Sequence, residues 1–222
     1  MLPSTEELSF QLKRSRRRTL AIEIDHHANV IVRAPTWVPS GEIQRFVRDR
    51  RDWVEQKIAE AHARRSIIPQ RTAQNQLYFR GALVSWGWHD AEVILPKAVT
   101  ASDAPRWLEQ WQRRQAHQIF QAMIDEELPR LGVAALRFNG LRLRKMRRRW
   151  GSCTRTGHIT LNEHLIRTPD ACIRGVVIHE LCHLVHLNHG TGFYALLTDL
   201  YPEHRLTDTI LGGWTSVIDA EF

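Results

Sequence analysis

The segment His-Glu-Leu-Cys-His at residues 179–183 constrains the fold more than any other short stretch of this chain. Two histidines four residues apart lie on one face of an α-helix, separated by roughly 40° around the axis and about 6 Å along it. From Asp170 onward, apolar residues recur at helical spacing. We therefore predict a helix that begins at Asp170 and presents both imidazoles on the same side.

Such a helix face predicts a zinc site with a general base beside it. His179 and His183 are then two preorganised metal ligands. Glu180 lies about 100° from His179 around the axis, close enough to reach a zinc-bound water without displacing it. Zinc lowers the pKa of that water toward 7, and a neighbouring carboxylate can take its proton. We expect Glu180 to be the catalytic base of a hydrolase that holds one zinc ion per chain.

A catalytic zinc generally needs a third protein ligand, and His189 is the expected one. Asn188 and Gly190 tolerate the left-handed conformation that ends a helix, so a turn there brings His189 back over the metal. His186 is on the ligand face but about 10 Å along the axis from the first ligand, which makes it a neighbour. Glu203, on the following segment, is the alternative third ligand.

Charge and composition limit the class of protein. Lysine and arginine total 31 against 24 acidic residues, a net charge of +7, with clusters at Lys13–Arg18 and Arg142–Arg149. This favours an anionic partner such as nucleic acid, although basic runs also serve simply as solvated faces.

The odd number of cysteines, three, argues against a disulfide framework. The start has no leader pattern and no apolar run approaches the ~18 residues of a membrane span, so we expect a soluble, cytoplasmic protein without membrane contact.

The order of elements predicts an α+β fold with an N-terminal β-rich subdomain (residues 1–100) and a catalytic domain (101–222). The first part has a hairpin between residues 8 and 32, a long amphipathic helix from Gly41 to about Arg64, and short strands between 77 and 95. A second long amphipathic helix, capped by Asp103, opens the second part. Extended runs at 136–146 and 158–166, the zinc helix and two shorter helices near 193–200 and 205–217 follow.

Three segments, RKMRRRWGSC, GHITLNEHLIRTP and VVIHELCHLVHLNHGTGFYALL, resemble the YgjP-like family of bacterial metal-dependent hydrolases, relatives of the SprT zinc peptidases. The similarity extends upstream to the ValArgAlaPro segment at 32–35 and covers almost the whole chain. It implies a zincin-like metallopeptidase core in which His179, His183 and His189 hold zinc and Glu180 is the base. This agrees with the ligand set that the spacing predicts.

The resemblance also implies substrate contacts. In zincins the strand before the metal helix lines the cleft and can pair with an extended peptide, and here that strand is residues 158–166. Asn162 then faces the cleft, or is simply a polar residue of an edge strand. Trp150 and Cys153 are expected to pack beside the site, with Cys153 as a fourth metal ligand the alternative to a core role.

Three functions remain open. A zinc peptidase is favoured, because this motif activates water against an acyl carbon. The alternative is a nucleotide pyrophosphatase acting on UTP, an assignment that the family also carries, since Arg147, Arg148 and Arg149 suit a triphosphate as well as nucleic acid. Such enzymes usually hold magnesium with a dense carboxylate cluster, which this chain lacks. A non-catalytic zinc-containing nucleic-acid-binding module is the third reading, and Glu180 argues against it.

Overall fold

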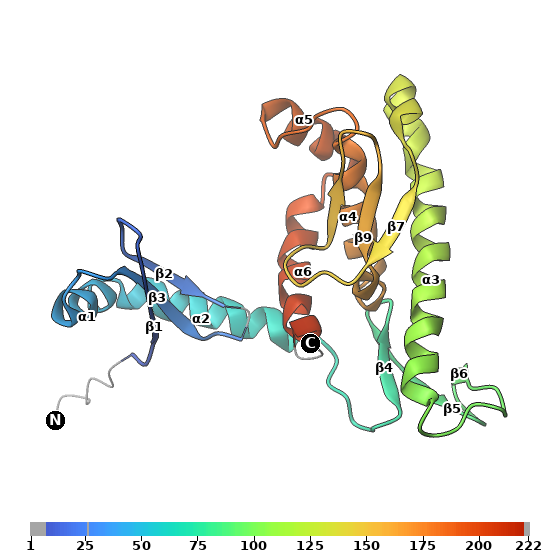
Figure 1. Cartoon of the computed structure of the whole chain (residues 1–222), viewed down its shortest axis with the longest axis horizontal. Coiled ribbons are helices and arrows are strands. Elements are labelled where there is room, and N and C mark those ends of the chain that lie inside the picture. The colour runs from blue at the N-terminus through green and yellow to red at the C-terminus, as the bar shows by residue number, and fades with distance from the viewer. Residues whose placement is uncertain (1–7, 26, 220–222) are drawn as a thin grey trace.

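The computed structural model describes residues 8–25 and 27–219, and Figure 1 shows an N-terminal arm that projects from a larger C-terminal part. The arm holds a three-stranded sheet of order β1-β3-β2. Its strands are β1 (Gln11–Ser15), β2 (Ala21–Ile24) and β3 (Val30–Pro35). β2 and β3 pair antiparallel, which confirms the predicted hairpin, while β1 adds to β3 in parallel.

The predicted helix from Gly41 to Arg64 is two helices, α1 (Ser40–Arg48) and α2 (Arg51–Ser66). The backbone leaves helical geometry at Arg50, with φ −118° and ψ 19°. α1 buries Ile43 and Val47 in the core of the arm, whereas α2 buries only Val54. α2 contacts β2 of the arm and also α6 (His204–Asp219) of the C-terminal part, so it connects the two (Figure 1).

A second sheet covers one end of the long helix α3 (Ala104–Glu127). Its order is β4-β5-β6, with β4 at Gln76–Phe79, β5 at Ala82–Gly87 and β6 at Val93–Ile94. Leu77, Val93 and Leu95 pack with Leu108 of α3 in one core. This core joins the β4–β6 sheet to α3, and the division of the chain at residue 100 stays a prediction.

The rest of the C-terminal part carries the predicted motif helix. After α3 the chain forms the 3₁₀ helix η1 (Leu128–Arg137), strands β7 (Leu141–Arg144), β8 (Gly151–Cys153) and β9 (Ile159–Asn162), the 3₁₀ helix η2 (Glu163–Arg167), then α4 (Asp170–Cys182) and α5 (Thr191–Leu200). The two predicted extended runs are therefore shorter than expected, because 3₁₀ turns occupy parts of both. α3 and α4 pack with β9 around the largest core.

The third sheet has the order β7-β9-β8, which contradicts the expected position of the strand before the metal helix. β9 is central, paired in parallel with β7 and antiparallel with β8. Both of its edges are used, so it cannot pair with a peptide. The edge strand that contacts α4 is β8. The architecture is mixed α/β, with small sheets and covering helices, and this confirms the predicted α+β class.

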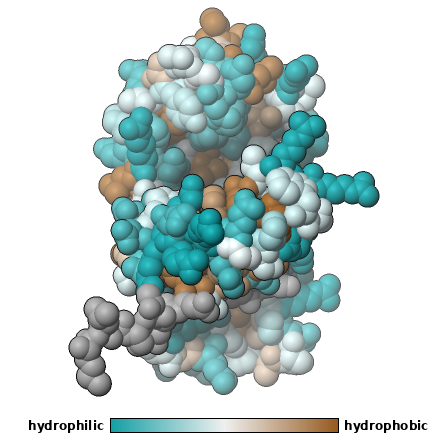
Figure 2. All heavy atoms as spheres, turned by 90° about the vertical axis from the view of Figure 1, so that its left-hand side faces the viewer, coloured by the Kyte–Doolittle hydropathy of each residue, from teal (hydrophilic) through white to brown (hydrophobic). Residues whose placement is uncertain are grey.

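Figure 2 views the molecule from the side of the arm, whose surface is largely hydrophilic. No helix within the described ranges is both long and apolar enough to cross a membrane.

Candidate metal centre

Three histidines converge at the carboxyl end of α4. His179 lies in its last turn, His183 directly follows it with helical φ −69° and ψ −15°, and His189 lies in the loop before α5. The ring centroids are 4.8 to 5.1 Å apart, and Nε2 of His179 is 3.1 Å from Nε2 of His189. One candidate ligand atom from each residue lies within 4.8 Å of the other two. The three residues that spacing singles out are thus brought together.

The donor set fits a zinc ion. Zn–N bonds of 2.0 to 2.1 Å in a tetrahedral site require nitrogens about 3.3 Å apart, close to the separation between His179 and His189. Nδ1 of His183 donates to the carbonyl oxygen of His186 at 2.9 Å. A proton fixed on Nδ1 leaves the lone pair of Nε2 available to a metal.

The surroundings of His179 and His183 favour their neutral imidazoles, the form that binds metal. Burial, with the neighbouring histidines, lowers the pKa of His179 to about 4, and burial also lowers the pKa of His183. Phe193 of α5, 1% exposed, contacts all three rings at centroid distances of 4.7 to 4.9 Å, edge-on with His179 and His189 and tilted with His183. It walls the cluster off on that side.

The alternative ligands lie elsewhere. Among the described residues, neither Glu203, His186 nor Cys153 belongs to the group of converging ligand atoms. The imidazole of His186 lies against Gly192, and only its backbone carbonyl serves the site. Burial, and then the charge of Glu180, raise the pKa of the Cys153 thiol to about 11, so it is protonated near neutral pH.

Glu180 points its carboxylate at the backbone of β8. The residue is 5% exposed, and burial raises its pKa to about 8, against a lowering influence of Arg149. Its Oε2 is buried without a hydrogen bond to the described protein. A Cβ on Gly151 would lie 2.4 Å from Oε1, so only glycine allows this approach. A buried carboxylate oxygen without a protein partner is unusual and is typical of catalytic groups.

Asn162 has a different position from the one expected. It is 2% exposed, and its Nδ2 donates to the carbonyl oxygens of Met146 (2.7 Å) and Arg149 (3.3 Å). Its Oδ1 accepts from the backbone N–H of His164. Because these bonds use both ends of the amide, Asn162 holds the loop before β8 in place and does not face the cleft.

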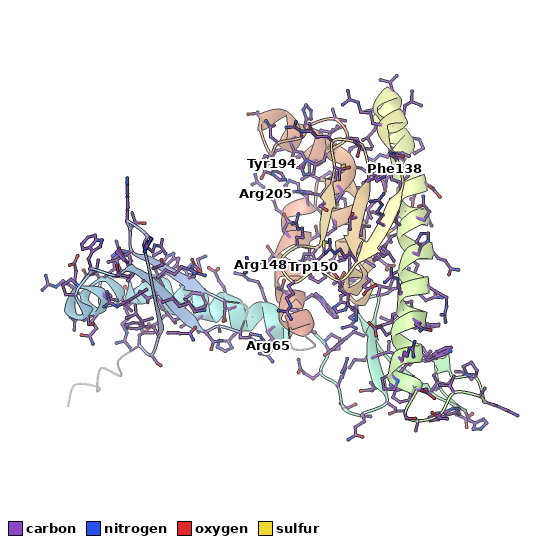
Figure 3. The ribbon with its side chains drawn as sticks, viewed as in Figure 1. Arg65, Phe138, Arg148, Trp150, Tyr194 and Arg205 are labelled. Atoms are coloured by element: carbon purple, nitrogen blue, oxygen red, sulfur yellow. The ribbon has the colours of Figure 1, made fainter. Side chains whose placement is uncertain are left out.

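Trp150 and the neighbouring arginines lie in that loop. Trp150 is half-buried and packs against two of the cores. Figure 3 shows Trp150 and Arg148 on the side of the sheet toward α6. Arg147, Arg148 and Arg149 are all exposed. Arg149 is near enough to Glu180 to lower the pKa of its carboxyl.

The basic stretch 142–149 is not one continuous patch. Its first part lies on β7 and its last part leads into β8, at opposite edges of the sheet. Lys145 pairs with Glu109 of α3, on the β7 side. The basic stretch is thus divided, and Arg149 is the member that influences the pKa of Glu180.

Sequence reasoning missed two contributors, Gly151 and Phe193. Both lie inside the segments on which the family resemblance rests, the W-G-S-C turn and the N-H-G-x-x-F continuation. Their roles depend on contacts with Glu180 and the histidines, which spacing along the chain does not reveal.

Three converging histidines beside a buried glutamate on an α+β scaffold have the features of a metal-dependent hydrolase. The family model described as YgjP-like, metallopeptidase domain, matches residues 18–212. The chain therefore belongs to the YgjP-like family, as the resemblance predicts, and this membership supports a metal-dependent peptidase. No curated protein and no solved structure matches the chain.

Proposed function

We propose that this protein is a zinc peptidase in which His179, His183 and His189 hold one zinc ion and Glu180 is the general base. The observation that carries the proposal is Glu180, which directly follows His179 in α4 and is buried with a carboxylate oxygen that no described protein group uses. A structural zinc site needs no such carboxylate.

The residues divide the chemistry among them. Zinc, when bound, supplies a Lewis acid that activates water and polarises the carbonyl of the substrate. Glu180 accepts a proton from the attacking water and returns it to the leaving amine. The contact between Gly151 and Oε1 fixes the position of the carboxylate, while Phe193 holds the imidazole rings in place.

The peptide binds along β8. This strand pairs with β9 on one side, and no described strand pairs with its other edge. An extended peptide can add there through main-chain hydrogen bonds, which selects for an unfolded segment and not for a particular sequence. Because the backbone of Gly151 touches Glu180, a peptide on this edge passes the base.

A nucleotide pyrophosphatase acting on UTP is the second candidate, and the exposed arginines 147–149 near the site favour it. The metal site argues for the peptidase, since imidazoles suit zinc while magnesium chemistry on phosphates relies on carboxylates. A nucleic-acid partner for the same arginines is compatible with either activity.

The test combines metal analysis with parallel assays on the full chain. We expect about one zinc per chain after dialysis, cleavage of unfolded protein substrates, and no turnover of UTP. Glu180→Gln keeps the shape of the side chain but loses the proton acceptor, so zinc should stay bound while hydrolysis falls by about 100-fold or more. Retained turnover in this variant would remove Glu180 from the mechanism, and hydrolysis of UTP alone would replace the peptidase by the second candidate.

A further inference from the structure

A small pocket opens beside the second metal ligand. It has a volume of about 230 Å³, and its walls include Arg137, Thr154, Arg155, Thr156, His183 and Leu187. The pocket lies between the end of η1, the turn that joins β8 to β9, and the loop that follows α4. Since His183 forms part of its wall, whatever fills the pocket lies next to the metal centre.

The walls are held together by specific contacts. The turn is fastened to the end of η1, because the carbonyl oxygen of Gly157 accepts from the N–H of Asn139 at 2.9 Å. Gly157 has φ +80°, and a Cβ there would lie 1.7 Å from the carbonyl oxygen of Arg137. Arg137 in turn donates from Nη1 to the carbonyl oxygen of Leu184 at 3.0 Å, beside the ligand His183. These contacts hold the three segments in a fixed arrangement around the pocket.

The charged side chains that line the pocket are all basic. Two guanidinium groups and two threonine hydroxyls line the pocket, and no carboxylate does. In the part of the chain that the structure describes, neither Arg137 nor Arg155 forms an ion pair. By contrast, Arg113, Arg130 and Arg174 each pair with a buried glutamate.

We propose that this pocket is a specificity subsite that binds a carboxylate of the peptide substrate within a residue or two of the scissile bond. The inference rests on the proposed peptidase function. Guanidinium and hydroxyl donors are the usual partners of a carboxylate. Leu184 and Leu187 provide apolar wall for the methylene groups of an Asp or Glu side chain.

The carboxylate has two sources, an internal Asp or Glu side chain and the carboxyl terminus of the peptide. Binding of an internal Asp or Glu side chain predicts an endopeptidase that prefers acidic residues. Binding of the carboxyl terminus predicts an exopeptidase. Peptides with a free or an amidated carboxyl terminus separate them, because amidation removes only the second source.

The experiment compares matched peptides that carry Glu, Gln or Lys at each position around one cleavage site. With zinc-loaded protein we expect kcat/KM for the best Glu peptide to exceed that of its Gln counterpart by about 5-fold, the upper range for solvent-accessible charge pairs. Arg155→Glu should reverse the order of the Glu and Lys peptides. Arg142→Glu is the matched control: it makes the same charge change at an exposed position of β7, the opposite edge of the sheet, and should keep the preference.

A binding measurement gives a readout independent of turnover. In the Glu180→Gln background, labelled Glu peptides should bind more tightly than Gln peptides, with a difference that shrinks at high salt and disappears with Arg155→Glu. Arg137→Lys retains the charge and should keep part of the preference.

The outcomes separate the two levels of inference. Cleavage without acidic preference, or a preference that Arg155→Glu leaves unchanged, overturns the subsite and leaves the peptidase intact. If no peptide is cleaved, the proposed function fails, and the binding measurement alone then decides whether the pocket selects carboxylates.

Discussion

At the scale of single residues, the contact between Gly151 and Glu180 is the most specific feature of the site. A methyl group on Gly151 would come within 2.4 Å of Oε1 and 2.7 Å of Cγ of Glu180. We therefore expect Gly151→Ala to displace the carboxylate and reduce peptide hydrolysis by at least about 10-fold, because small misplacements of a catalytic group are costly. Zinc content should be unchanged.

Gly41→Ala is the control for Gly151→Ala. Gly41 lies in α1 of the arm, and a Cβ there meets nothing within 4 Å. Its steady-state kinetics should match the wild type. If Gly151→Ala also had wild-type kinetics, Glu180 would not depend on this contact for its position.

At the scale of elements, the loop between α4 and α5 completes the metal centre. We expect His189→Ala to weaken zinc binding by more than about 100-fold, beyond the usual effect of losing a group that merely supports a ligand. His186→Ala should have a small effect, because His186 serves the site through its backbone carbonyl. Competition with a chelator measures both affinities. Unchanged affinity in His189→Ala, with loss in Glu203→Ala, would transfer the ligand role to Glu203.

The turn between β8 and β9 is a second element on which the site depends. We expect Gly157→Ala to lower the free energy of unfolding, because it adds a steric conflict with the carbonyl oxygen of Arg137 to the strain of a positive φ. Gly140→Ala isolates the strain, since Gly140 has φ +103° with nothing within 4 Å of a Cβ. Denaturant unfolding should show Gly157→Ala to be less stable than Gly140→Ala by about 1 kcal/mol or more. Equal stabilities would mean that the turn can move to accommodate the methyl group without disturbing η1.

At the scale of the whole molecule, buried histidines make stability depend on pH. His164 of η2 is 7% exposed, and burial, with smaller contributions from Arg167 and Lys145, lowers its pKa to about 4. The unfolded chain therefore binds this proton more readily between pH 6.5 and 4. Stability should fall as the pH drops through that window, by up to about 3 kcal/mol from this residue. Unfolding curves of His164→Gln should show a weaker pH dependence, and an unchanged dependence would contradict the assignment.

The sequence could predict those features that depend on residues close together in the chain. The helix at residues 170–182, its pair of histidines and the flanking Glu180 follow from a period of 3.6 residues, which acts within a few turns. The hairpin in the arm and the α+β class follow from similarly local patterns. His189 could be predicted because only five residues separate it from His183. The function as a zinc peptidase is a proposal built on these residues.

Only the tertiary structure decided which distant segments meet. The residue pattern of a strand does not reveal which strands lie beside it. The sequence therefore could not predict three features: the central position of β9, the burial of Asn162, and the division of the basic stretch between two sheet edges. The break at Arg50 likewise depends on where α2 finds a partner. The pocket of Arg137 and Arg155 joins residues from three elements. Such contacts depend on packing between elements that are far apart in the chain. A short stretch of sequence therefore does not reveal them.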